Sequence, residues 1–176
     1  MATPEFVLEL RAKVGTAELW MPGVTAVVLR HLPDSTGARR PVDWDAQLDP
    51  ATVEVLLVQR ADNGHWTPVT GIIDPREEPA VAGARETREE AGVEARAVRL
   101  LSTEAIGPLQ YPNGDRASYL DIAFAYEWVG GEPHPADGEN TRAEFVRADQ
   151  LPALNARFTR VIARALTGRA AADFAS

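Results

Sequence analysis

The sequence has 176 residues, and its 26 acidic side chains against 18 Lys and Arg give a formal net charge of −8. This length favours a single domain with its own core, and the acidic balance argues against a nucleic-acid-binding protein, because a phosphate backbone would be repelled. Cysteine is absent, which excludes disulfides, zinc–thiolate sites and thiol nucleophiles. A small phosphate-bearing ligand is still possible, but an acidic site would need a bound cation to hold it.

The first residues, Met1 to Gly15, include Glu5 and Glu9 and lack the basic start and apolar run of a secretory signal. The longest uncharged, mainly apolar run is Leu19 to Leu29, far short of the ~20 residues that cross a bilayer. We therefore expect a cytoplasmic protein with no membrane partner.

The first half of the chain predicts two strands after an opening helix. Apolar residues at helical spacing place the helix over 6–14, and runs rich in Val and Leu place strands over 24–32 and 53–60. The polar, turn-prone segment 33–52 between the strands is expected to be a long loop. Asp62-Asn63-Gly64 then favours a tight turn.

The middle of the chain predicts a loop over 71–78, a helix and two long strands. Pro79 is suited to the first turn of the helix, and Gly92 is suited to its C-terminal end. The strands are expected over 95–106 and 118–128. In the second strand, alternation predicts one shared apolar face made of Leu120, Ile122, Phe124, Tyr126 and Trp128.

The last part of the chain predicts a Gly/Pro-rich loop over 130–140 and a short strand over 144–147. Apolar residues at helical spacing (Leu154, Phe158, Ile162 and Leu166) then predict an amphipathic closing helix. Residues 168–176 are expected to form a flexible tail. Together these elements predict one α/β domain over 1–176, with helices packed on a sheet.

Three glutamates on the central helix carry the main chemical signal. Glu86, Glu89 and Glu90 fall on one helical face because they are spaced i, i+3 and i+4. A bare acidic face of this kind is often only solvated surface. Like charges at this spacing repel, however, and a bound divalent cation would remove the repulsion; oxygen ligands favour Mg²⁺ or Mn²⁺. The opposite, closely packing face is predicted to contain Ala80, Ala84, Thr87 and Ala91, with Val81 at its margin.

The spacing of fixed residues around this helix resembles the signature of the Nudix hydrolase family. The matching positions are Gly71, Glu77, Arg85-Glu86, Glu89-Glu90, Gly92 and Val93. The resemblance implies a Nudix-type α/β/α sandwich, with a mixed curved sheet and helices on both faces. It also implies a MutT-like pyrophosphohydrolase that cleaves a nucleoside diphosphate linked to another group. Thr87 stands where the signature has an apolar residue, and its methyl group can still face a core.

The resemblance assigns roles to the residues of the signature. Glu86, Glu89 and Glu90 would hold the metal, helped by the backbone carbonyl of Thr70. Arg85 would orient the carboxylates and pair with Glu77, while Gly71 and Gly92 would have structural roles. A further family acid on a later loop is expected at Glu139, with Asp137 and Glu144 as alternatives. Water activated by the metal would attack the pyrophosphate, with Glu86 or Glu139 as the base.

The substrate-binding residues are expected among exposed aromatic and amide side chains. Tyr111, Tyr119 and Trp66 are candidates for stacking on a base, although a Trp is more often part of a core. Asn155 is a candidate for contacting a base edge or for capping the closing helix. Pro108 fits a position typical of ADP-ribose hydrolases, whereas Tyr111 fits one typical of dinucleoside polyphosphate hydrolases. The hairpin and the opening Leu10-Arg11…Gly15 also look like nucleoside triphosphate-cleansing members. These marks disagree, so the substrate stays undecided, with an ADP-ribose-like compound or a nucleoside triphosphate as the expectation.

The sequence leaves open whether the protein is an enzyme and whether it forms a dimer. A non-catalytic Nudix module that binds a nucleotide-type ligand as a sensor is the alternative to an enzyme, although the acids of the signature are intact. The isopentenyl diphosphate isomerase branch is excluded because it uses a catalytic Cys. Many relatives form homodimers, and the opening helix with its neighbouring strand is the expected contact.

Overall fold

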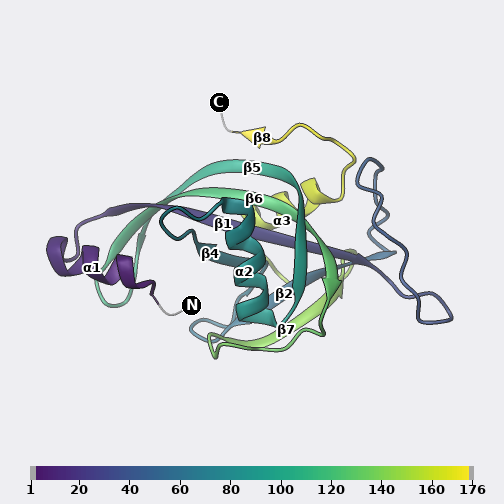
Figure 1. Ribbon diagram of the computed structural model, residues 1–176, viewed down its shortest axis with the longest axis horizontal. Helices are drawn as coiled ribbons and strands as arrows, with labels where there is room; N and C mark the ends of the chain where they lie inside the picture. The colour runs from purple at the N-terminus through teal and green to yellow at the C-terminus, as the bar shows by residue number, and fades with distance from the viewer. Residues whose placement is uncertain (1–2, 175–176) are drawn as a thin grey trace.

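The computed structural model describes residues 3–174 as a mixed α/β domain built around one eight-stranded sheet (Figure 1). The elements in chain order are α1 (Glu5–Val14), β1 (Leu19–His31), β2 (Val53–Arg60), β3 (Trp66–Thr67), β4 (Val69–Ile72), α2 (Pro79–Ala91), β5 (Glu94–Gln110), β6 (Arg116–Gly130), β7 (Asn140–Arg147), α3 (Ala156–Ala165) and β8 (Asp173–Phe174). Within these residues, no helix is long and apolar enough to cross a membrane.

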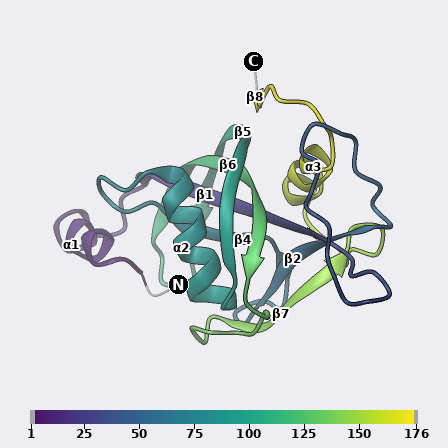
Figure 2. The same cartoon turned by 45° about the vertical axis from the view of Figure 1, so that its right-hand side comes forward.

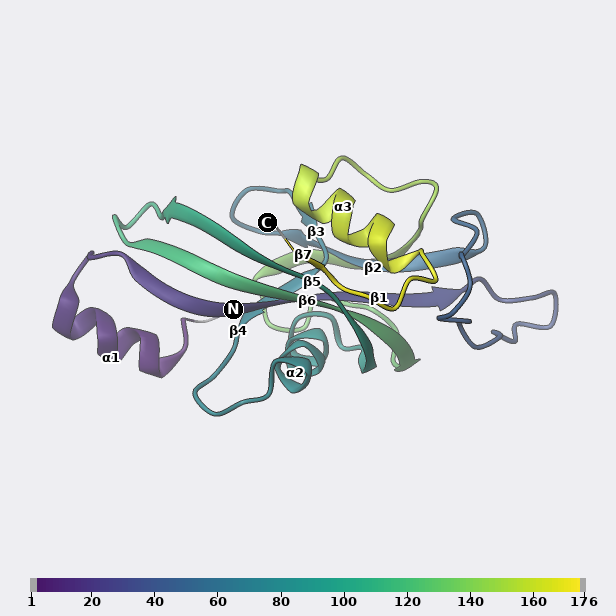
Figure 3. The same ribbon diagram turned by 90° about the horizontal axis from the view of Figure 1, so that it is seen from above.

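The sheet mixes parallel and antiparallel pairs around the central strand β1. Its order is β3-β2-β1-β6-β5-β8, with β4 also paired to β1 and β7 to β2. β1 runs parallel to β6, and β5 parallel to β8; the other pairs are antiparallel. Helix α2 covers one face and α3 the other (Figure 3). The predicted α/β/α arrangement is confirmed.

Alternate residues of the central strands supply two separate cores. Val27 and Leu29 of β1 pack toward α3, together with Ile162 of that helix. Ala26 and Val28 face the opposite way and pack in a second core on the α2 side. Because both faces are covered, these strands are near-continuous apolar runs rather than alternating ones.

The predicted alternation of residues 118–128 is confirmed in the part of the strand that lies in the two cores. Phe124 and Tyr126 share the α2-side core, and Ala123 and Ala125 on the other face are buried in the α3-side core. Small residues suffice there because α3 packs close to the sheet. An alternating pattern therefore indicates which residues share a face, without showing that the other face is solvated.

Two segments without predicted structure pack against the domain. The segment 33–52 contains no helix or strand, as expected, but Val42 and Leu48 are buried in the α3-side core. In the expected tail, Asp173–Phe174 pair with Ser102–Thr103, and Asp173 forms an ion pair with Arg164. The described part of this segment therefore lies on the sheet edge, and residues 175–176 fall outside the described residues.

Helix α1 lies beside one end of the sheet, at a distance from α3 (Figures 1 and 2). Its Val7 is buried against Met21 of β1 and Ala117 of β6. Arg11 ties the helix to the segment before β1 and to the start of β6 by donating to the carbonyl oxygens of Ala17 and Arg116. This arrangement makes α1 one wall of the cavity described below.

Candidate active site

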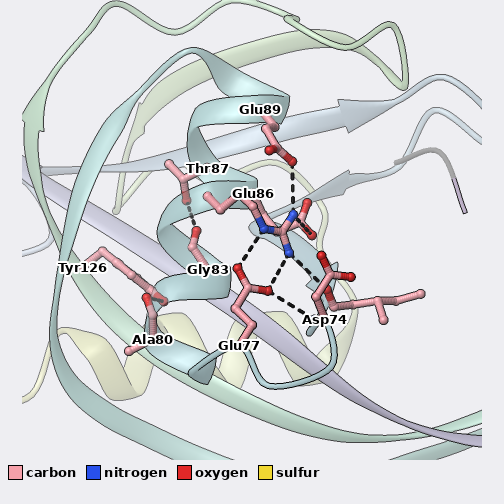
Figure 4. Close-up of polar contacts among 10 residues, drawn as sticks. Asp74, Glu77, Ala80, Gly83, Glu86, Thr87, Glu89 and Tyr126 are labelled. Atoms are coloured by element: carbon pink, nitrogen blue, oxygen red, sulfur yellow. Dashed lines mark hydrogen bonds and ion pairs between the residues drawn. The ribbon is translucent and has the colours of Figure 1, made fainter. Parts of the chain in front are cut away.

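Helix α2 begins and ends where the sequence predicts and packs very closely on the sheet. Pro79 is in its first turn, and Gly92 ends it with a φ of 66°. A Cβ at Gly83 would lie 2.1 Å from the hydroxyl oxygen of Tyr126. That hydroxyl donates to the carbonyl oxygen of Ala80 at 3.0 Å, so α2 is fixed to β6 at this point (Figure 4).

The predicted division of α2 into a packing face and a carboxylate face is wrong. The buried residues are Ala82, Gly83, Glu86, Thr87, Glu90 and Ala91, whereas Val81 is exposed. The helix contacts four strands, namely β1, β4, β5 and β6. The buried part of its circumference is therefore wider than that of a helix that lies on a flat sheet. Glu86 and Glu90 fall inside this buried part, and Glu89 remains exposed.

Gly71 of β4 makes room for the carboxylate of Glu86. A Cβ at this position would lie 2.3 Å from both Cδ and Oε1 of Glu86, closer than any real contact. The side chain of Glu86 therefore lies directly over the backbone of β4. The φ of Gly71 is not positive, so its backbone conformation does not require glycine. The close contact with Glu86 does.

Arg85 is the centre of an ion-pair network that fixes the loop before α2, and Figure 4 labels its partners Glu77, Glu86 and Glu89. Its Nε and Nη2 donate to the two carboxylate oxygens of Glu77 at 2.8 and 2.9 Å, which confirms the predicted pairing. Its Nη1 donates to Glu86 at 2.9 Å and to Glu89 at 3.1 Å. Arg85 holds the pKa of Glu77 below its usual value through these hydrogen bonds. One guanidinium thus orients three acids.

Burial works against the charged forms of the other two carboxylates. It raises the pKa of Glu86 to about 8 and that of Glu90 to about 7, although Arg85 and Asn140 respectively act in the opposite direction. The amide of Asn140 donates to Glu90 at 3.1 Å. Glu86 and Glu90 are therefore two desolvated carboxylates close to a third acid, Glu89. Their charged forms need more positive charge nearby than Arg85 alone supplies.

These residues suit a divalent metal by their chemistry. They offer carboxylate oxygens, the ligand type that hard cations prefer, and two of the acids are desolvated. Across residues 3–174, no three acidic or His side chains already enclose one point. Glu86 and Glu89 turn toward Arg85, and Glu90 turns toward Asn140.

A cavity of about 510 Å³ lies next to the carboxylates. Several predicted site residues line it, namely Thr70, Gly71, Glu90, Tyr111, Tyr119 and Glu139. The hydroxyls of Tyr111 and Tyr119 are hydrogen-bonded at 2.7 Å. Glu86 lies next to the cavity, packed against the Gly71 backbone, and the half-exposed Glu89 is held by Arg85. The structure therefore places Glu90 of the signature and the two tyrosines on one cavity, whereas Glu86 and Glu89 are not among the residues that line it.

Two predicted substrate-binding residues lie elsewhere. Trp66 packs against the α3-side core, with the guanidinium of Arg142 5.3 Å from the centre of its ring. Asn155 is the N-cap of α3, where its Oδ1 accepts from the backbone N–H of Phe158 at 2.8 Å. Neither lines the cavity, so their expected roles in substrate binding are not supported.

The structure also separates the candidates for the additional acid. Glu139 lines the cavity, whereas Asp137 caps the same turn by accepting from the N–H of Glu139 at 3.0 Å. Glu144 forms an ion pair with Arg142 on β7. Glu139 is the acid of this group that faces the cavity.

Five charged residues that line the cavity were missed by sequence reasoning: Arg11, Arg60, Asp115, Asp121 and Arg157. Two of them carried a signal. Asp121 is an acid between the apolar residues Leu120 and Ile122 of β6, where an unpaired charge is costly. Arg157 is a cation in the first turn of a helix, where the helix dipole disfavours it.

The fold and the cavity define a mixed α/β domain with a carboxylate helix beside a ligand-sized space, and comparison with known proteins gives its family. Residues 41–166 match the NUDIX domain. This match covers more than half of the chain, which therefore belongs to the Nudix hydrolase family.

Individual relatives differ in what their names say they cleave. A bis(5'-nucleosyl)-tetraphosphatase of Mus musculus is 48% identical over 50 residues, which is 28% of this chain and 34% of the relative. The NAD-capped RNA hydrolase NudC of Deinococcus radiodurans is 33% identical over 115 residues, 63% of this chain and 38% of the relative. The matches thus span a minor part of either relative. An ADP-ribose pyrophosphatase from Streptococcus suis shares the fold, with a TM-score of 0.58, 20% identity and coverage of 88% and 98% of the two chains.

Proposed function

We propose that this protein hydrolyses a pyrophosphate bond in a nucleoside diphosphate derivative, either ADP-ribose-like or a nucleoside triphosphate. The observation that carries the proposal is that one cavity joins Glu90, Glu139 and the Gly71 backbone to the Tyr111–Tyr119 pair. Such a cavity can hold a charged diphosphate at one end and an aromatic or sugar group at the other.

The proposed reaction needs a divalent metal, Mg²⁺ or Mn²⁺. Glu86, Glu89 and Glu90 would hold it, with the carbonyl oxygen of Thr70. When bound, the metal neutralises the acids, binds phosphate oxygens and lowers the pKa of a water molecule. Arg85 keeps Glu86 and Glu89 oriented through the contacts of its Nη1.

The protein side of the proposed chemistry is the removal of one proton from the attacking water. Glu86 and Glu139 are the two candidates for this base, because one lies next to the cavity against Gly71 and the other lines it. No nucleophilic side chain is required, so no covalent intermediate with the protein forms. The tyrosine pair would contact the nucleoside or sugar by stacking.

Glu89→Gln tests the assignment of the acids. The substitution keeps the shape of an exposed side chain but removes the charge of one proposed metal ligand, so kcat at saturating Mg²⁺ should fall by about 10²-fold or more. The neighbouring exposed Arg88 provides a matched control, since Arg88→Gln changes a charge on the same helix turn and should leave kcat unchanged. Activity of Glu89→Gln near that of wild type would refute the assignment.

A further inference from the structure

The floor of the cavity contains a buried hydrogen-bonded cluster that the proposed chemistry does not use. Arg157 reaches in from α3, and its Nη1 donates to Oδ2 of Asp121 at 2.6 Å and to Thr25 at 3.0 Å. Thr25 in turn donates to Oδ1 of Asp121 at 2.8 Å. Asp121 and Thr25 are buried, and the side chain of Arg157 is 21% exposed. Asp121 and Arg157 both line the cavity, and Arg157 is the more exposed of the two.

The guanidinium of Arg157 has donors to spare. One nitrogen, Nη1, makes both of its hydrogen bonds, and within residues 3–174 neither Nε nor Nη2 donates a hydrogen bond. Asp121 holds Nη1 through a short ion pair, and the guanidinium packs over the ring of Phe158 at 4.2 Å, so the two contacts together restrict the direction of the remaining N–H groups. Arg157 is thus a pre-positioned donor on the cavity wall.

Gly23 of β1 leaves the space in front of this cluster open. A Cβ there would lie 3.5 Å from Cδ1 of Tyr119, 3.6 Å from the carbonyl oxygen of Gly71 and 3.9 Å from Oδ1 of Asp121. A methyl group therefore fits without strain but fills the space between the tyrosine and the backbone beside Glu86. We call Gly23, Asp121 and Arg157 the polar floor.

The charges around the polar floor favour an uncharged ligand group. Each of the three arginines that line the cavity already has an acidic partner: Arg11 with Asp115 at 3.5 Å, Arg60 with Asp62 at 2.8 Å, and Arg157 with Asp121 at 2.6 Å. A paired arginine still donates hydrogen bonds but attracts a phosphate less than a free one does. The diphosphate thus belongs at the carboxylate end with its metal, and the polar floor suits a group with neutral oxygen or nitrogen acceptors.

We propose that Arg157 determines specificity by donating from Nε and Nη2 to the base or ribose of the substrate's nucleoside, and that Asp121 is the positioning residue that holds Arg157. This rests on the proposed function for the identity of the substrate, but nucleoside binding can be measured without hydrolysis. The nucleoside would lie over the polar floor, beside Tyr119.

The test is equilibrium titration of the intact protein with AMP, GMP, CMP and UMP without metal, and with inorganic pyrophosphate in the presence of Mg²⁺. Wild type should bind at least one nucleoside monophosphate, and Arg157→Ala should weaken that binding by about tenfold or more, because it removes hydrogen bonds donated by a charged group. Pyrophosphate binding should not change. Arg160→Ala is the matched control, because Arg160 lies one turn further along α3 and also forms an ion pair at 2.6 Å, with Glu104, but does not line the cavity.

Two further variants separate a specificity role from a purely structural one. Gly23→Ala should keep the thermal midpoint and still weaken nucleoside binding, and Asp121→Asn should weaken it less than Arg157→Ala. Equal nucleoside binding by Arg157→Ala and wild type would overturn the proposal, as would equal losses for nucleotide and pyrophosphate, or wild type that binds no nucleotide. Wild type that binds a nucleotide but hydrolyses nothing would refute the proposed function and leave this inference standing.

Discussion

Replacing Glu86 by Gln should lower kcat by about 10³-fold, the largest effect of any single substitution in this protein. Glu86 is the most buried acid at the site, since it is only 1% exposed, lies over Gly71 and accepts from Arg85. Glutamine has the same shape but cannot supply the negative charge for a metal ion or accept the proton of water. Steady-state rates at saturating substrate and Mg²⁺ measure the effect.

Thermal unfolding of the same variant distinguishes a lost function from a lost fold. Burial disfavours the charged form of Glu86, raising its pKa to about 8, so the carboxylate is kept at a cost to stability. The metal-free Glu86→Gln protein should therefore unfold at a temperature no lower than that of wild type. A kcat within about threefold of wild type, with an intact fold, would show that Glu86 is neither a required metal ligand nor the base.

Gly71→Ala should lower kcat by about 10²-fold, because small displacements of catalytic groups cost this much. The new Cβ would lie 2.3 Å from Cδ and Oε1 of Glu86, so the two cannot coexist in their present positions. The atoms in conflict are the end of a side chain, which can turn away more easily than backbone. The substitution therefore moves the carboxylate and leaves β4 in place.

Gly130→Ala is the matched control for this prediction. Gly130 also lies in a strand, and a Cβ there meets no atom within 4 Å. Both variants should give the circular dichroism spectrum of wild type, and only Gly71→Ala should lose activity. Full activity of Gly71→Ala would show that the position of Glu86 against β4 is unimportant for turnover.

The sequence predicted the central features of the site because they depend on local spacing. Three glutamates at i, i+3 and i+4 must share a helical face whatever surrounds the helix, and an Arg four residues before a Glu can reach it. Gly92 ends α2 for an equally local reason, its positive φ. The Arg85–Glu77 pair joins the loop to the helix only eight residues further along the chain.

The features that the sequence did not reveal depend on contacts between distant segments. Trp66 is beside the signature in the chain but packs on the opposite side of the sheet, since alternate residues of a short strand face opposite ways. Arg157 reaches Asp121 from a helix 36 residues later. The burial of Glu86 follows from the way α2 packs against four strands, which helical periodicity does not contain.

The most direct measurement of the central claim is release of phosphate-containing products, with Mg²⁺ or Mn²⁺, from ADP-ribose, sugar nucleotides, dinucleoside polyphosphates and nucleoside triphosphates. We expect cleavage of the pyrophosphate bond in at least one ADP-ribose-like compound or nucleoside triphosphate, loss of that activity on adding EDTA, and its loss in Glu86→Gln. Absence of hydrolysis of every compound with either metal, by folded wild-type protein, would contradict it and favour a module that binds nucleotides without cleaving them.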